Sequence, residues 1–118
     1  MRTIIAGSRG ITDRNLVDDA IQAAALFEGI VPTLVVSGAA HGVDDLGEQW
    51  AAEHGVPVKQ YPANWKMVGH AAGFQRNYTM AQNADALIAV WDGRSPGTRH
   101  MIALAHKYKL HVYVARVP

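Results

Sequence analysis

The chain has 118 residues, of which 49% are hydrophobic and 18% charged, a balance typical of a globular domain rather than a disordered segment. It has no cysteine, which excludes disulfides, thiolate zinc sites and cysteine nucleophiles. The formal net charge of +1 argues against a strongly basic nucleic-acid-binding surface. No apolar run approaches the ~20 residues of a membrane helix, and the first residues lack a signal-peptide pattern, so we expect a cytoplasmic protein.

Short apolar runs alternate with longer amphipathic stretches. Taken in chain order, the pattern predicts a strand over residues 3–6, a helix from a cap at Asp13 to about residue 28, a strand over 33–37, a helix over 43–54, a strand over 57–61, a helix over about 71–83, a strand over 85–90, a helix over 98–109 and a last strand over 111–116.

This alternation predicts the α/β class. We expect one Rossmann-like three-layer domain over residues 1–118, with a mostly parallel five-stranded sheet and helices on both faces. Right-handed crossovers make such a sheet doubly wound. From the alternation of strands and helices and the repeated glycine loops, we expect the strand order 3-2-1-4-5 by chain number. In such a sheet, ligands bind at the carboxyl edge of the strands, near the point where the strand order reverses.

Three of the predicted strands end in glycine-rich loops that lead into helices. Glycine lets a phosphate approach the backbone closely, and a helix N-terminus presents unpaired N–H groups and partial positive charge. One such loop alone is more often an ordinary tight turn, but three at equivalent positions favour binding. The candidate ligand-binding residues in these loops are Gly7, Ser8 and Arg9, then Ser37, Gly38, Ala39, Gly42 and Asp44, and then Asp92, Gly93, Ser95, Gly97, Thr98 and Arg99.

Arginines on three separate elements complete the predicted site. We expect Arg9, Arg76 and Arg99 to converge on one anionic ligand, because guanidinium groups make bidentate contacts to phosphate. Asn77, beside Arg76 on the third helix, is a further candidate. Asp44 and Asp92 keep two interpretations, stabilisation of a helix start or loop, and hydrogen bonds to ligand hydroxyls.

Other common chemistries are disfavoured. The six histidines are scattered, and His100 and His106 lack the i, i+4 spacing of a helical metal site, so we predict no metal. The chain has no Walker lysine motif and no GxGxxG fingerprint after its first strand. An ordinary NAD dehydrogenase or P-loop NTPase is therefore not expected.

Four segments together, residues 5–9, 36–44, 73–80 and 91–101, resemble the SLOG superfamily, in particular its YspA-like branch of bacterial and phage proteins. The resemblance implies a Rossmann-like fold with a pocket for a nucleotide or nucleotide-derived ligand. It also implies a homo-oligomer, a dimer or higher, because the related LOG proteins are commonly dimers.

Two relatives suggest activities. The LOG, or lysine-decarboxylase-like, phosphoribohydrolases have a glycine motif similar to residues 38–42, an arginine similar to Arg76 and a Gly-Thr pair similar to Gly97-Thr98. Their catalytic glutamate corresponds to Met101 here, and methionine cannot act as a general base. DprA-type relatives bind single-stranded DNA. The YspA-like pattern usually has arginine where this chain has His41.

Three functions therefore remain. The favoured one is a binding module that senses or sequesters a nucleotide-derived metabolite, in a defence-related setting of bacteria or phages, with no cofactor beyond that ligand. The alternative is an N-glycosidase or phosphoribohydrolase acting on nucleoside monophosphates, in which Asp44 and Arg76 would be the catalytic candidates. Single-stranded DNA binding is third, because it requires a basic groove and stacking aromatics.

Overall fold

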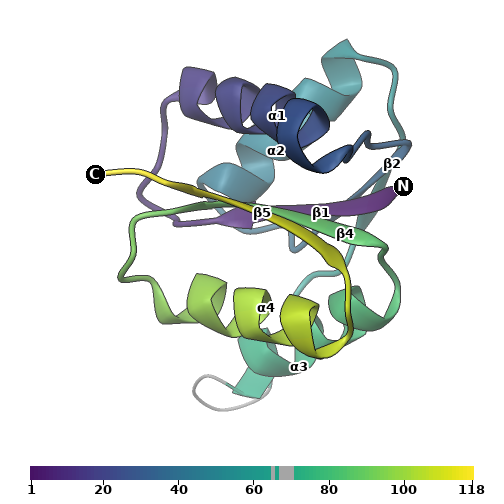
Figure 1. Ribbon diagram of the computed structural model, residues 1–118. Helices are drawn as coiled ribbons and strands as arrows, with labels where there is room; N and C mark the ends of the chain where they lie inside the picture. The colour runs from purple at the N-terminus through teal and green to yellow at the C-terminus, as the bar shows by residue number, and fades with distance from the viewer. Residues whose placement is uncertain (65, 67–70) are drawn as a thin grey trace.

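A computed structural model of the protein describes residues 1–64, 66 and 71–118 and shows four helices around one sheet (Figure 1). The elements in chain order are β1 (Arg2–Gly7), α1 (Arg14–Glu28), β2 (Leu34–Ser37), α2 (Val43–Glu53), β3 (Val58–Gln60), α3 (Ala71–Gln82), β4 (Ala86–Trp91), α4 (Pro96–Lys107) and β5 (His111–Arg116).

The sheet has five strands in the order β3-β2-β1-β4-β5, and every neighbouring pair is parallel. This confirms the predicted α/β architecture and strand order. Helices α1 and α2 cover one face of the sheet, and α3 and α4 cover the other, so the molecule has three layers (Figure 1). The strand order reverses between β1 and β4, which places the loops after these strands side by side at the carboxyl edge.

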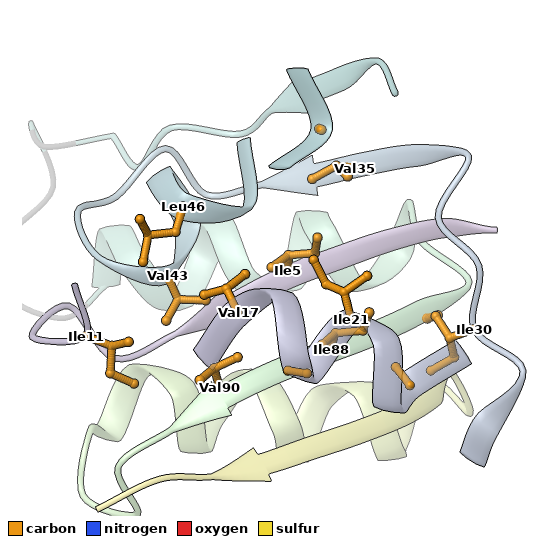
Figure 2. Close-up of a cluster of buried hydrophobic side chains, with 14 residues drawn as sticks. Ile5, Ile11, Val17, Ile21, Ile30, Val35, Val43, Leu46, Ile88 and Val90 are labelled. Atoms are coloured by element: carbon orange, nitrogen blue, oxygen red, sulfur yellow. The ribbon is translucent and has the colours of Figure 1, made fainter. Parts of the chain in front are cut away.

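Each face of the sheet has its own hydrophobic core. Under α1 and α2, the core includes the helical stripe Val17, Ala20, Ile21 and Ala24, spaced for one side of a helix, which packs on strand residues such as Ile5 and Ile88 (Figure 2). Under α3 and α4, the core is built around Ile4, Leu87, Met80 and Met101. Both central strands, β1 and β4, are thus buried on both sides, as parallel sheets require.

The predicted elements are all present, with ends that agree to within two residues. The largest difference is at α4, which begins at Pro96 rather than Thr98 and ends at Lys107. Proline suits the first helical position, where its missing N–H costs no hydrogen bond, and Ser95 becomes the N-cap. The predicted loop after β3 includes Trp65, which lies outside the described residues.

Among the described residues, no helix is long and apolar enough to cross a membrane.

Candidate functional site

A cavity of about 420 Å³ opens at the carboxyl edge of the sheet, between the loops after β1, β2 and β4 and helix α3. We call it the main cavity. Its volume lies within the range of small-molecule sites. It is lined by Ala6, Gly7, Arg9, Gly10, Ala40, Asp44, Gly73, Phe74, Arg76, Asn77, Met80, Ser95, Pro96, Gly97, Thr98 and Met101.

The first turn of α4 forms one wall of the main cavity. Residues Ser95, Pro96, Gly97 and Thr98 line it, and this turn contains no acidic residue. The first N–H groups of a helix have no partner within the helix, and they carry partial positive charge. The start of α2 differs, because Asp44 and Asp45 lie in its first turn. The N-terminus of α4 is therefore better suited to bind an anion than the N-terminus of α2.

Arg76 and Asp44 approach each other across the loop after β2. The Nη1 group of Arg76 donates to the Gly38 carbonyl oxygen at 2.5 Å. A Cβ added to Gly38 would lie 2.5 Å from Arg76 Nη1 and 2.7 Å from Asp44 Oδ2. Only glycine leaves room for this close approach, so Gly38 shapes the site although it does not line the cavity.

Burial of the Asp44 carboxyl raises its pKa from 3.8 to about 6. The nearby Arg76 guanidinium and the N–H of Ala40, which donates to Asp44 Oδ2 at 3.3 Å, pull the pKa the other way. Burial also lowers the pKa of Arg76, and Asp44 opposes that shift. Among the described residues that line the main cavity, Asp44 is the only carboxylate.

Asn77, which lines the main cavity, links helices α3 and α4. This buried side chain accepts a hydrogen bond from Arg76 Nε through Oδ1 at 3.0 Å. Its Nδ2 donates to the Gly97 carbonyl oxygen at 3.2 Å and to His100 Nδ1 at 3.1 Å. With Nδ1 as acceptor, the neutral His100 ring carries its proton on Nε2, and burial lowers the pKa of His100. Asn77 therefore fixes both Arg76 and the start of α4.

Ser8, Asp92 and Ser95 brace the loop after β4. Asp92 Oδ1 accepts the N–H groups of Arg94 and Ser95, both at 2.8 Å, and these bonds lower the Asp92 pKa to about 2. Ser95 Oγ donates to Ser8 Oγ at 3.0 Å, and Ser8 Oγ accepts the N–H of Asp92 at 3.0 Å. Of the two interpretations of Asp92, the structure shows the contacts of loop stabilisation.

The loop after β2 is braced in a similar way. Ser37 Oγ donates to Glu48 Oε2 at 2.6 Å and accepts the N–H of Ala39 at 3.1 Å. Ala39 has a φ of 57° and Gly42 a φ of 79°, both in the left-handed region. This geometry folds the loop toward Asp44, and Ser37 supports it from the end of the strand.

The three predicted arginines are placed differently. Arg9 and Arg76 line the main cavity. Arg99 does not: its Nη2 donates to the Gly93 carbonyl oxygen at 3.4 Å, and its guanidinium lies 5.5 Å from the centroid of the Trp91 ring. The sequence-predicted residues outside the lining are Ser8, Ser37, Gly38, Ala39, Gly42, Asp92, Gly93 and Arg99, which build or flank the loops.

Several lining residues were not on the predicted list, including Phe74, Met80 and Met101. Phe74 also packs against His100, with ring centroids 4.2 Å apart. Helical spacing could have indicated Met80, because Gly73, Arg76, Asn77 and Met80 recur at the intervals of one side of α3. Met101 is 1% exposed and lies where α4 meets the sheet, so its position in the wall depends on tertiary packing.

No group of three or more His, Cys, Asp or Glu side chains that could hold a metal ion occurs in the part of the chain that the structure describes.

A parallel sheet of this order, covered on both faces and hollowed at its carboxyl edge, defines a Rossmann-like α/β protein. The chain belongs to the YspA, cpYpsA-related SLOG family, whose family model matches residues 1–67. It is also similar to the protein named Gene 61 protein of Mycobacterium phage D29, with 38% identity over 112 residues, covering 90% of this chain and 89% of the relative. No solved structure matches the chain. The family match confirms the resemblance found in the sequence.

Proposed function

We propose that the protein binds a nucleotide or nucleotide-derived metabolite in the main cavity and acts as a sensor or sequestering module. The observation that carries this proposal is the meeting of four features in one cavity: Arg9, Arg76, the acid-free first turn of α4, and the Asp44 carboxyl. Membership of the SLOG family supports a nucleotide-related ligand.

Each part of a nucleotide has matching chemistry in the cavity wall. The N–H groups of Gly97 and Thr98 in the first turn of α4, with the guanidinium groups of Arg9 and Arg76, suit a phosphate. The carboxylate of Asp44 suits ribose hydroxyls, which donate hydrogen bonds. The exposed ring of Phe74 suits the flat face of a base, with the buried Met80 and Met101 behind it in the cavity wall.

The test is titration calorimetry with AMP and GMP, combined with mass spectrometry of small molecules that copurify under native conditions. Arg76→Ala should weaken binding by roughly ten- to a hundredfold, since a hydrogen bond to a charged group contributes about 1.5–3 kcal/mol. Arg76→Lys should restore only part of the affinity, because lysine keeps the charge and loses the planar donor geometry.

The matched control is Arg2→Ala, which removes a guanidinium at the amino end of β1, where Arg2 pairs with Asp85 at 2.9 Å. If Arg76→Ala binds AMP and GMP as tightly as Arg2→Ala, and thermal melting shows both variants folded, the proposed site is wrong.

One observation favours a second candidate, hydrolysis of nucleoside monophosphates. Asp44 is a cavity carboxyl with a raised pKa beside an arginine, an arrangement that catalytic acids and bases share. Against it, Met101 occupies the wall where the LOG relatives have their catalytic glutamate. We therefore expect no release of free adenine or guanine at enzymatic rates. Chromatographic detection of turnover that Asp44→Ala abolishes would favour the hydrolase instead.

A further inference from the structure

A second, smaller cavity of about 290 Å³ lies beside the first, at the carboxyl end of β3. We call it the β3 cavity. Its walls come from the end of β3 and the residues that follow it, and from the side of α3 that faces them. Arg76 lines both cavities, so the two cavities share this residue.

The polar chemistry of the β3 cavity is one-sided. Its lining residues include two cations, Lys59 and Arg76, and the carboxamides Gln60, Asn64 and Gln75. Lys59 Nζ lies 5.8 Å from the centroid of the Tyr61 ring, within the range of a cation–π contact, and Tyr61 also lines the cavity. No carboxylate is among the described residues that line it. An arrangement of this kind attracts anions.

The acids that contact residues of this lining do so from outside it: Asp44 approaches Arg76 across the loop after β2, and Glu48 is already hydrogen-bonded. Glu48 accepts hydrogen bonds from Ser37 Oγ at 2.6 Å and from Gln60 Nε2 at 2.8 Å, one on each oxygen. Arg76 is held from behind by Asn77 Oδ1 and the Gly38 carbonyl, bonds that use Nε and Nη1. Its Nη2 group carries two further N–H donors for a ligand.

We propose that the β3 cavity binds a phosphate group, and that the ligand of this protein is a nucleotide with a second phosphate set apart from the first. The phosphate site stands on the β3 cavity alone, whereas the nucleotide part rests on the proposed function. Arg76 then contacts the ligand between its two anionic ends, and Lys59 discriminates ligands that have the second phosphate from those that lack it.

The first experiment is an NMR titration of the ¹⁵N-labelled full chain with inorganic phosphate. The amide signals of Gln60, Tyr61 and Gln75 report on the β3 cavity, and those of Gly97 and Thr98 report on the main cavity. Both sets should shift. Lys59→Gln should weaken the response of the first set by roughly tenfold, the loss of about one charged hydrogen bond, and leave the second set unchanged.

The matched control is Lys107→Gln, which removes the same charge at the last residue of α4, away from the carboxyl edge. It should change neither set. Shifts confined to Gly97 and Thr98 would overturn the β3 site and leave the proposed function standing. Shifts confined to the β3 set would support this site and contradict the proposed phosphate position in the main cavity. No shift in either set would overturn both.

The second experiment compares AMP with adenosine 3′,5′-bisphosphate by calorimetry. The wild type should bind the bisphosphate roughly tenfold more tightly than AMP, and Lys59→Gln should bind the two compounds about equally. Equal affinities in the wild type would overturn the inference that the ligand carries a second phosphate. If neither compound binds, the proposed function fails for adenine nucleotides, and the phosphate titration still decides the β3 site.

Discussion

At the scale of single residues, Asp44 shows how the site costs stability. The side chain is 6% exposed and its carboxyl pKa is raised to about 6 by burial. Each unit of pKa shift corresponds to about 1.36 kcal/mol, so ionised Asp44 destabilises the unliganded fold by about 3 kcal/mol. A buried charge kept at such a cost is typical of a position that serves binding rather than folding.

The sign of the resulting pH dependence follows from the direction of the shift. Because folding raises this pKa, the folded state binds the proton more tightly, and stability falls as the pH rises from about 4 to about 6. Asp44→Asn removes this titration. We expect the variant to gain stability over the wild type by about 2 kcal/mol between about pH 4.5 and about pH 7.5, measured by urea denaturation.

The difference in unfolding free energy between the wild type and Asp44→Asn reports on the titration of Asp44 alone. The lowered pKa values of Asp85, Asp92 and His100 give their own pH dependence, but they act alike in both proteins. A difference in unfolding free energy that stays constant over this pH range would show that Asp44 is not destabilised by burial.

At the scale of elements, helix α1 has well-defined ends. Asp13 adopts extended backbone angles and its Oδ1 accepts the N–H of Asn15 at 2.9 Å, which confirms the predicted cap. Gly29 closes the helix with a left-handed φ of 65°. Since α1 contributes Val17, Ala20, Ile21 and Ala24 to one core, its start affects the stability of the domain.

Asp13→Ala should therefore lower the unfolding free energy by about 1 kcal/mol, because the Asn15 N–H loses its partner. For a domain of this size that corresponds to roughly 4 °C or more in Tm. The matched control is Asp19→Ala, an exposed acid in the middle of the same helix, which should change Tm little. Equal losses from the two variants would contradict the capping role.

The loop that leads into α2 depends on Gly42. Its φ of 79° is strained for any L side chain, and an added Cβ would lie 2.5 Å from the Ser8 carbonyl oxygen and 2.6 Å from that of Arg9. These backbone atoms cannot shift easily to make room for a side chain, so the loops after β1 and β2 pack tightly against each other at Gly42.

Gly42→Ala should destabilise the protein by about 1–3 kcal/mol and weaken AMP binding, because both loops must move. Gly10→Ala is the control for stability: it also lies in a cavity-lining loop, but an added Cβ there meets nothing within 4 Å. Thermal melting of both variants is the measurement. If the Gly42→Ala protein has the same Tm as the Gly10→Ala protein, the loop tolerates a side chain at residue 42.

At the scale of the whole molecule, the central strands of the sheet are better protected than the edge strand β3. Strands β1 and β4 pair on both sides and are covered by helices on both faces. Strand β3 is short, lies at the edge of the sheet beside β2, and its three residues are exposed. The β3 cavity is therefore built partly on the least protected strand.

Native-state hydrogen exchange should reflect this order. We expect the amides of β1 and β4 to exchange only through global unfolding, and those of β3 to exchange faster through local opening. Saturating adenosine 3′,5′-bisphosphate should slow exchange in β3 more than AMP does, if the second phosphate binds beside it. Exchange in β3 as slow as in β1 without ligand would contradict the proposed gradient.

The order of the elements, the parallel sheet and the strand order could be predicted from the sequence. Hydrophobic periodicity and glycine-rich strand ends depend on residues that are neighbours in the chain, so they can be recognised without the tertiary structure. From the sequence we also predicted that Arg9, Arg76, Asn77 and residues at the start of α4 contribute to a binding site, and the structure brings these residues together around one cavity.

Other features were decided only by the tertiary structure. Arg99 lies in the first turn of α4, which forms a wall of the main cavity, yet its guanidinium lies 5.5 Å from the centroid of the Trp91 ring and Arg99 is not among the lining residues. Met101 and Phe74 enter the wall because α3 and α4 pack side by side, and Lys59 joins Arg76 only because β3 ends next to α3. Where a side chain points across an element, and which distant residue it meets, depends on packing between elements that no local pattern records.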